Sequence, residues 1–186
     1  MRIVGLAGPI GSGKTLAASM VPGAHHLQWA DPIYRGLAAM LDIDEEILRD
    51  RAQKETGIPA GGFELVPRQL LRTLGTEWGR ELVHPDLWVR LTMLRIDRLG
   101  RSIGSDTFAI CGTRFPNEVA AIRDRGGEVW WIERPGLGRG SHKSDHQIGP
   151  GDCDAVIGND GTVEEFRRRV LDAWTAYAGR SACRAG

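Results

Sequence analysis

Short apolar runs alternate with longer segments of helical spacing along the chain. The runs are too short for helices and lie between helical patterns, which is typical of strands in a parallel sheet. They cover Arg2 to Ala7, His26 to Trp29, Thr107 to Cys111, Glu128 to Ile132 and Ala155 to Ile157. The pattern therefore predicts an α/β fold on one central parallel sheet of about five strands.

The segments between these runs place apolar residues at helical spacing, and several begin with proline, which suits the first turn of a helix. The predicted helices cover Pro32 to Leu41, Asp44 to Lys54, Pro67 to Leu82, Pro85 to Leu99, Pro116 to Arg125 and Val163 to Tyr177. Thr162 and Glu165 have the spacing of a capping box, which sets the start of the last helix. Glycine-rich stretches at residues 57–62, 100–105 and 136–151 predict loops.

The composition narrows the choice of compartment and partner. The 186 residues suit one domain, and 24 basic residues balance 24 acidic ones, which argues against nucleic acid or an anionic membrane as a partner. The longest stretch without charged side chains contains Pro22 and Gly23 and is no membrane span. Three cysteines without metal or disulfide spacing fit a reduced, cytoplasmic compartment. Any phosphate recognition must therefore be local.

Residues 8–15, Gly-Pro-Ile-Gly-Ser-Gly-Lys-Thr, match the phosphate-loop pattern in full and lie between a strand and a helix. Glycines let the backbone amides of such a loop cradle phosphate oxygens at a helix N-terminus. Lys14 would then hold the terminal phosphates, and Thr15 would ligate Mg²⁺ through its hydroxyl. The alternative is a glycine-rich turn with a solvated lysine. The predicted ATP-binding residues are Gly11, Ser12, Gly13, Lys14 and Thr15.

The third predicted helix carries an apolar stripe on one face and arginines on another. The stripe, which we expect to be buried, consists of Leu70, Leu74, Trp78 and Leu82. Arg68 and Arg72 lie one turn apart on the outward face with Gly79 beside them, so both guanidiniums can bind one phosphate. The alternative is a solvated charged face that pairs with Glu64 or Glu77.

The stretch from Glu133 to His146 follows a predicted strand and mixes basic side chains with glycines. A flexible loop that brings arginines over a transferred phosphoryl group and excludes water is a mechanical requirement of a kinase. The composition therefore predicts a lid at about residues 134–146. The alternative is an ordinary surface loop.

The strand at residues 107–111 is followed by Gly112, at a place where a phosphate-loop enzyme usually carries an aspartate for Mg²⁺. Either Thr15, substrate phosphates and water hold the ion, or another acid substitutes. Asp31 follows a predicted strand and begins a helix, which places it at the carboxyl edge of the sheet as the candidate substitute. The alternative is that Asp31 caps the helix before Pro32.

Two tryptophans and one cysteine are candidates of a weaker kind. Trp78 and Trp88 can stack on a base, although an aromatic residue at helical spacing more often belongs to the core. We assign Trp78 to the core and keep Trp88 as a candidate substrate-binding residue. Cys111, on a predicted strand, is expected to be a small buried hydrophobic residue.

Together these segments resemble the deoxynucleoside monophosphate kinases of bacteriophages and some bacteria, over most of the chain. The phosphate loop alone is generic, whereas the later segments in this order are much more specific. The segments are residues 8–15, 30–32, 67–77, 84–89, 114–118, 133–135, 142–145 and 159–162. The resemblance implies the three-layer P-loop NTPase fold as a single domain over residues 1–186, with a helical monophosphate-binding insertion at about 31–99.

The resemblance also implies a reaction and its residues. The γ-phosphoryl of ATP would pass to a deoxynucleoside monophosphate, with Mg²⁺ required and the monophosphate bound by Asp31, Arg35, Arg68 and Arg72. Arg114 is similar to the family's arginine after the strand that reaches the phosphates, and Arg134 and Arg139 are similar to its lid arginines. Asp145 stands where family members carry glutamate, and Gly112 where they carry aspartate. The predicted catalytic residues are Lys14, Arg114, Arg134 and Arg139.

Other functions fit parts of the same pattern. One alternative is another small-molecule P-loop kinase, for example one that acts on dephospho-coenzyme A or a sugar acid. A second is a nucleotide-binding protein whose catalysis is impaired through Gly112. A nucleic-acid-binding module has little support in the balanced charge. The enzyme is expected in the cytoplasm, in the host cytoplasm if a phage encodes it, and a homodimer is a possible assembly.

Overall fold

The computed structural model describes residues 1–50, 52–138 and 147–183, which form two compact units. One unit, called here the sheet unit, contains residues 1–28 and the chain from residue 95 onward. The other, called here the helical unit, contains residues 29–94. Each unit has its own hydrophobic core, so each is described by itself.

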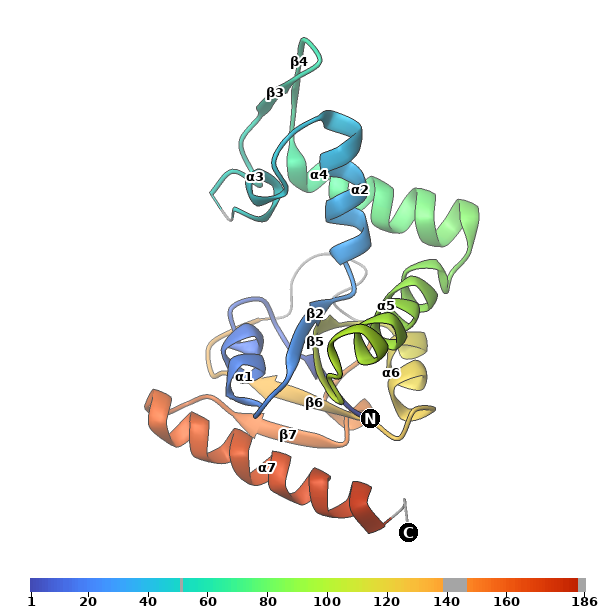
Figure 1. The fold of residues 1–186 in the computed structure, drawn as a ribbon. Coiled ribbons are helices and arrows are strands. Elements are labelled where there is room, and N and C mark those ends of the chain that lie inside the picture. Colours follow the sequence, from blue (N-terminus) through green and yellow to red (C-terminus); the bar gives the residue numbers. More distant parts are fainter. Residues whose placement is uncertain (51, 139–146, 184–186) are drawn as a thin grey trace. The chain divides into compact units, whose positions relative to one another are not determined.

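The sheet unit is built on five parallel strands in the order β2-β5-β1-β6-β7 (Figure 1). The strands are β1 (Arg2–Ala7), β2 (His25–Gln28), β5 (Thr107–Thr113), β6 (Glu128–Glu133) and β7 (Ala155–Gly158). All five coincide with the predicted apolar runs, so the predicted α/β fold with a central parallel sheet is confirmed. The three central strands, β5, β1 and β6, are buried on both faces and therefore have nearly continuous apolar sequences, which the pattern located.

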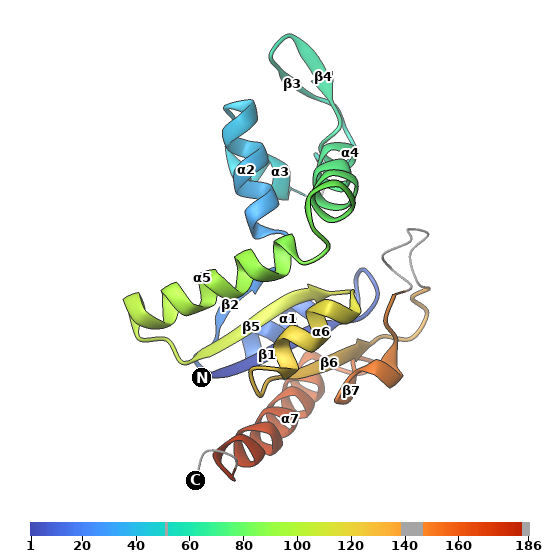
Figure 2. The same cartoon turned by 90° about the vertical axis from the view of Figure 1, so that its right-hand side faces the viewer.

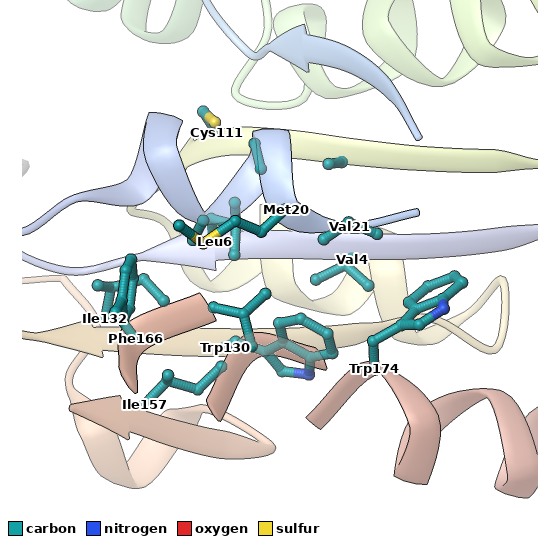
Figure 3. Packing of buried hydrophobic residues seen from close by; sticks show 14 of the residues in the cluster. Val4, Leu6, Met20, Val21, Cys111, Trp130, Ile132, Ile157, Phe166 and Trp174 are labelled. Carbon is teal, nitrogen blue, oxygen red and sulfur yellow. The ribbon is translucent and has the colours of Figure 1, made fainter. Parts of the chain in front are cut away.

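Helices cover both faces of this sheet (Figures 1 and 2). On one face, α1 (Lys14–Met20) and α7 (Val163–Cys183) pack on alternate residues of the strands, including Leu6, Trp130 and Ile157 (Figure 3). On the other face, α6 (Pro116–Arg123) packs so closely that a Cβ at Gly5 would overlap Ile122. The predicted capping box is present, because the N–H of Glu165 donates to Thr162 Oγ1 at 3.2 Å and that of Thr162 to Glu165 Oε2 at 2.7 Å.

The helical unit begins with α2 (Asp31–Leu41) and α3 (Glu45–Arg49), followed by a hairpin of β3 (Ile58–Ala60) and β4 (Phe63–Leu65). Then come α4 (Pro67–Arg72), the π-helix η1 (Thr73–Val83) and α5 (Leu87–Ile103), which continues into the sheet unit. The core of the unit gathers Tyr34, Leu37, Ala38, Leu48 and Ile58. A short 3₁₀ helix, η3 (Pro150–Asp152), belongs to the sheet unit.

Two predicted elements in the helical unit have different bounds from those expected. The predicted helix 44–54 ends at Arg49, because the Asp50 carboxylate accepts the backbone N–H of Ala52 at 2.7 Å and of Gln53 at 3.2 Å, a local turn that competes with the helix. The predicted loop at 57–62 is largely a hairpin. Its turn residues, Gly61 and Gly62, have φ of 57° and 82°, as a two-residue hairpin turn requires.

The predicted apolar stripe of the third helix is wrong in its second half. Trp78 is 46% exposed and Leu82 is 80% exposed, whereas Gly75 and Gly79 face the core. The prediction assumed the α-helical repeat, but residues 73–83 form a π-helix, in which each hydrogen bond spans five residues and each residue turns by a smaller angle. The apolar spacing therefore selected a different face from the one that is buried. The side of this helix that faces the core therefore carries glycines rather than Trp78 and Leu82.

Candidate active site

Four loops meet at the carboxyl edge of the parallel sheet, which is the edge where open α/β folds bind their ligands. The phosphate loop follows β1, and Arg114 and Phe115 follow the end of β5. Residues 134–138 follow β6, and Asn159 and Asp160 follow β7. All four loops belong to the sheet unit.

The phosphate loop has a backbone that only glycine adopts readily. Gly8, Gly11 and Gly13 have φ of 127°, 83° and 104°, in the region that L side chains rarely occupy. A Cβ at Gly8 would also overlap the carbonyl oxygen of Ile132 in β6. The loop leads directly into the N-terminus of α1, whose first amides have no partner within the helix. This geometry forms an anion-binding cradle.

Lys14 lies over this cradle. Its ammonium donates to the backbone carbonyl oxygens of Gly8 at 2.8 Å and Pro9 at 2.6 Å, so the side chain curls back across the loop. Thr15 is exposed on the first turn of α1. Cys111 is buried, as predicted, and its thiol contacts the Lys14 carbonyl oxygen at 3.7 Å. The loop, Lys14 and Thr15 thus form one continuous surface at the N-terminus of α1.

Gly112 forms a bulge at the end of β5, where the register with β1 shifts. Leu6 pairs with Cys111 and Ala7 pairs with Thr113, so Gly112 has no partner on β1. Its φ of 83° is the conformation that glycine adopts at no steric cost. The residue that the sequence marks as a missing carboxylate is therefore also a residue whose backbone favours glycine.

Replacing Gly112 by aspartate is expected to destabilise the protein. An L side chain at this φ costs about 1–2 kcal/mol, although space is open around the added Cβ. Urea denaturation measures the effect, with Gly151→Asp as the matched control, because Gly151 is exposed, has no positive φ and also has open space. Equal stability of the two variants would show that the bulge does not select glycine.

Arg114 follows this bulge, and its backbone is held in place by hydrogen bonds to a buried carboxylate. Glu118, 1% exposed, accepts the backbone N–H of Arg114 at 2.7 Å and of Phe115 at 3.2 Å. Ionised acceptors make such hydrogen bonds stronger than neutral ones. Sequence reasoning placed Glu118 in a motif without assigning it this contact. The start of the loop that carries the Arg114 side chain is therefore fixed by α6.

A pocket of about 360 Å³ lies beside the phosphate loop in the sheet unit. It is bounded by the ends of β6 and β7 and by the first residues after β6. The lining residues are Pro9, Trp131, Glu133, Arg134, Pro135, Gly136, Leu137, Pro150, Gly158 and Asp160. Arg134, a predicted lid residue, thus borders a concave site that begins at the loop. Arg139, the other predicted lid arginine, and most of the predicted lid at 134–146 lie outside the described residues.

Comparison with a family model decides the family. A model of the deoxynucleotide monophosphate kinase family matches residues 60–170, more than half of the chain. This chain belongs to the deoxynucleotide monophosphate kinase family. It is therefore a nucleoside monophosphate kinase, as the sequence predicts. A protein of Acanthamoeba polyphaga mimivirus, whose name proposes a deoxynucleotide monophosphate kinase, is 29% identical over 92% of this chain and 95% of its own.

Two solved structures have a fold similar to that of this chain. TT1252 from Thermus thermophilus has a TM-score of 0.51 at 22% identity and covers 94% of this chain and 96% of its own. The dephospho-CoA kinase from Campylobacter jejuni has a TM-score of 0.54 at 14% identity and covers 97% of this chain and all of its own. At these identities the likeness shows the fold alone.

The monophosphate-binding residues that the family resemblance implies lie in the helical unit. Asp31 is the first residue of α2, with Ala30 at the cap position, so Asp31 is not the helix cap. Its carboxylate pairs with Arg49 at 2.7 Å. Arg68 pairs with Glu55 instead of Glu64 or Glu77, and Arg35 and Arg72 are exposed. Their part in substrate binding stays a prediction.

Lys54 is a cation of the helical unit that the sequence analysis did not identify as a candidate. The Lys54 ammonium donates to the Tyr34 hydroxyl at 2.7 Å and lies 5.0 Å from the centroid of the Tyr34 ring. The Arg49 guanidinium lies over the same ring at 4.4 Å. No local pattern signals this contact, because Lys54 and Tyr34 lie 20 positions apart in the sequence. Two cations and a buried aromatic ring therefore lie near Asp31.

Trp88 packs in the core. It is 5% exposed, and its indole N–H donates to the Gly75 carbonyl oxygen at 2.6 Å. A Cβ on Gly79 would overlap the same ring, so the space that the sequence assigned to a ligand beside Gly79 is filled by Trp88. The substrate-binding role of Trp88 stays a prediction, and the structure shows a packing role for its ring. Gly79 and Trp88 instead form a packing pair.

The described residues contain no group of three or more His, Cys, Asp or Glu side chains placed to hold a metal ion. Within the described ranges, no helix combines the length and apolarity needed to cross a membrane.

Cys153 is expected to be unreactive at neutral pH. Burial, reinforced by Asp152 and Asp154, raises the pKa of its thiol to about 11, so almost none of the nucleophilic thiolate is present. Iodoacetamide at about pH 8 should modify exposed Cys183 well before Cys153, as peptide mass spectrometry will show. Equal labelling rates would mean that Cys153 is accessible and easily ionised.

Proposed function

We propose that the protein transfers the γ-phosphoryl group of ATP to a deoxynucleoside monophosphate and forms the diphosphate. Family membership supports a nucleotide substrate. The observation that carries the proposal is the anion-binding cradle at Gly8 to Thr15, overlaid by Lys14 and continuous with the pocket beside β6 and β7. The phosphates of ATP would occupy the cradle, and its nucleoside would occupy the pocket.

The reaction needs no protein nucleophile. An oxygen of the acceptor phosphate attacks the γ-phosphorus of ATP, and the bond from that phosphorus to the β,γ-bridging oxygen breaks to release ADP. The task of the protein is to align two anionic groups and to neutralise their charge. Lys14 and the loop amides serve ATP, and Arg114, Arg134 and Arg139 neutralise the transferred group. Asp31, Arg35, Arg68 and Arg72 serve the acceptor in the helical insertion at about 31–99.

The family implies Mg²⁺, and the residues present fit a metal carried by the nucleotide. Mg²⁺ usually binds through one or two protein oxygens, substrate phosphates and several waters. The Thr15 hydroxyl, exposed beside Lys14, would supply one protein ligand, and the ion would neutralise phosphate charge. Gly112 supplies no carboxylate. Asp31 is the other candidate ligand, although its carboxylate is paired with Arg49.

An acceptor panel tests the proposal. ADP formation is measured with Mg²⁺ and ATP against the four common deoxynucleoside monophosphates, their ribose counterparts and dephospho-coenzyme A. We expect turnover that depends on a deoxynucleoside monophosphate. Turnover with dephospho-coenzyme A alone would establish the alternative kinase. ATP binding without any acceptor-dependent turnover would support a protein whose catalysis is impaired.

A further inference from the structure

The segment Asn159-Asp160-Gly161-Thr162 joins β7 to α7 and contacts the phosphate loop. The Asn159 side-chain amide donates to the Ser12 carbonyl oxygen at 2.8 Å, a contact between residues 147 positions apart. Its backbone N–H donates to the Glu133 carbonyl oxygen at 2.7 Å, at the end of β6. Asn159 is therefore held to β6 by its backbone and holds the loop with its side chain.

The neighbours of Asn159 make this contact rigid. Arg169 of α7 donates to the Gly158 carbonyl oxygen at 2.7 Å and pairs with Asp160. Gly158 and Asp160 also line the pocket beside the loop. The same short segment therefore borders the pocket on one side and holds the phosphate loop on the other.

The contact determines the direction of one backbone amide. The Ser12–Gly13 peptide is trans, as are all peptide bonds of the described chain, so the Ser12 carbonyl and the Gly13 N–H point in opposite directions. With the carbonyl held by Asn159, the Gly13 N–H must face the other side of the loop. Gly13 makes this possible, because a Cβ there would come within 2.5 Å of the Asn159 amide nitrogen.

We propose that Asn159 is a positioning residue that orients the Gly13 N–H toward the phosphates of ATP. Asn159 itself does not touch the nucleotide; it preorganises a donor that does, so that binding need not order the loop. The inference rests on the proposed binding of ATP phosphates in this loop. It also gives the Asn159 segment a function that family resemblance alone does not assign.

The test separates binding of phosphate from folding. Asn159→Ala removes the donor, and Asn159→Asp keeps the shape but turns a carboxylate oxygen toward the Ser12 carbonyl. Isothermal titration calorimetry measures binding of tripolyphosphate and of ATP. For Asn159→Ala we expect Kd to rise roughly five- to tenfold for both ligands, and more for Asn159→Asp. The KM for ATP should rise alongside, while the KM for the acceptor stays unchanged.

Two controls distinguish a positioning role of Asn159 from a general destabilisation of residues 159–162. Thr162→Ala removes the capping contact with Glu165 three residues away, without touching the phosphate loop, and should leave both Kd values unchanged. In ligand-free protein, the amide NMR signal of Gly13 should shift in Asn159→Ala and stay in place in Thr162→Ala. A Gly13 signal that does not move, or equal weakening of binding by Thr162→Ala, would overturn the proposal.

Failure of the proposed reaction has a different signature. If the wild type shows no acceptor-dependent ADP formation but tripolyphosphate binding still weakens in Asn159→Ala, the reaction is wrong and the positioning role stands. If both Asn159 variants bind tripolyphosphate as tightly as the wild type, the positioning role is wrong whatever the reaction. Wild-type protein that binds neither tripolyphosphate nor ATP would overturn both proposals.

Discussion

Lys14→Ala is expected to lower kcat for phosphoryl transfer by at least 10²- to 10³-fold, the range typical of losing one preorganised donor to transition-state charge. The Lys14 ammonium has two backbone carbonyl partners in the ligand-free loop, at 2.8 and 2.6 Å, and it must exchange them for phosphate oxygens when ATP binds. Alanine leaves the cradle but removes the charge above it. Initial rates of ADP release at saturating ATP and acceptor measure the loss.

The fold should survive this substitution. Lys14 is only half-buried and lies outside the core, so circular dichroism and the urea midpoint should stay near those of the wild type. Arg167→Met is the matched control, because Arg167 is an exposed cation of the same unit that pairs only loosely with Glu164, at 3.7 Å. Undiminished turnover in Lys14→Ala, or an equal loss in Arg167→Met, would contradict the proposed mechanism.

Trp88→Ala is expected to destabilise the protein by about 3–5 kcal/mol, the usual cost of truncating a buried tryptophan. The substitution removes the ring that fills the space over Gly79 and leaves the Gly75 carbonyl oxygen without its indole donor. Urea denaturation followed by far-ultraviolet circular dichroism measures the change in the free energy of unfolding.

Two companion variants separate packing from base stacking. Trp88→Phe keeps an aromatic ring but loses the hydrogen bond, so it should cost about 1–3 kcal/mol and leave the KM for the acceptor unchanged. Trp78→Ala removes a half-exposed ring 6.3 Å from that of Trp88 and should cost less than about 1.5 kcal/mol. A stable Trp88→Ala protein with a raised acceptor KM would instead support a stacking role for Trp88.

The sheet unit was predictable from sequence because its signals are local. Each buried strand is a short apolar run, and the phosphate loop, from Gly8 to Thr15, is a contiguous motif at the end of the first run. The capping box of α7 involves residues only three apart, Thr162 and Glu165. Patterns of this kind need no knowledge of what packs against them.

The features that sequence reasoning missed depend on contacts or on backbone geometry. Which face of η1 is buried depends on hydrogen bonds that span five residues, and the apolar spacing does not reveal this hydrogen-bond pattern in advance. Gly112 suggested a lost ligand in the sequence, but its bulge appears only when β5 is paired with β1. Asn159 lies in one of the segments that carry the family resemblance, yet its partner Ser12 is brought to it only by the order of strands in the sheet.

The helix α5 has a consequence for how the two units unfold. Its residues up to Leu94 belong to the helical unit, and those from Arg95 belong to the sheet unit, without a break in the helix. In an α-helix each N–H donates to the carbonyl four residues earlier, so the amides of residues 95–98 are protected by carbonyls of residues 91–94. Local opening of the helical unit is therefore expected to expose the amides of residues 95–98 to hydrogen exchange, although these residues belong to the sheet unit.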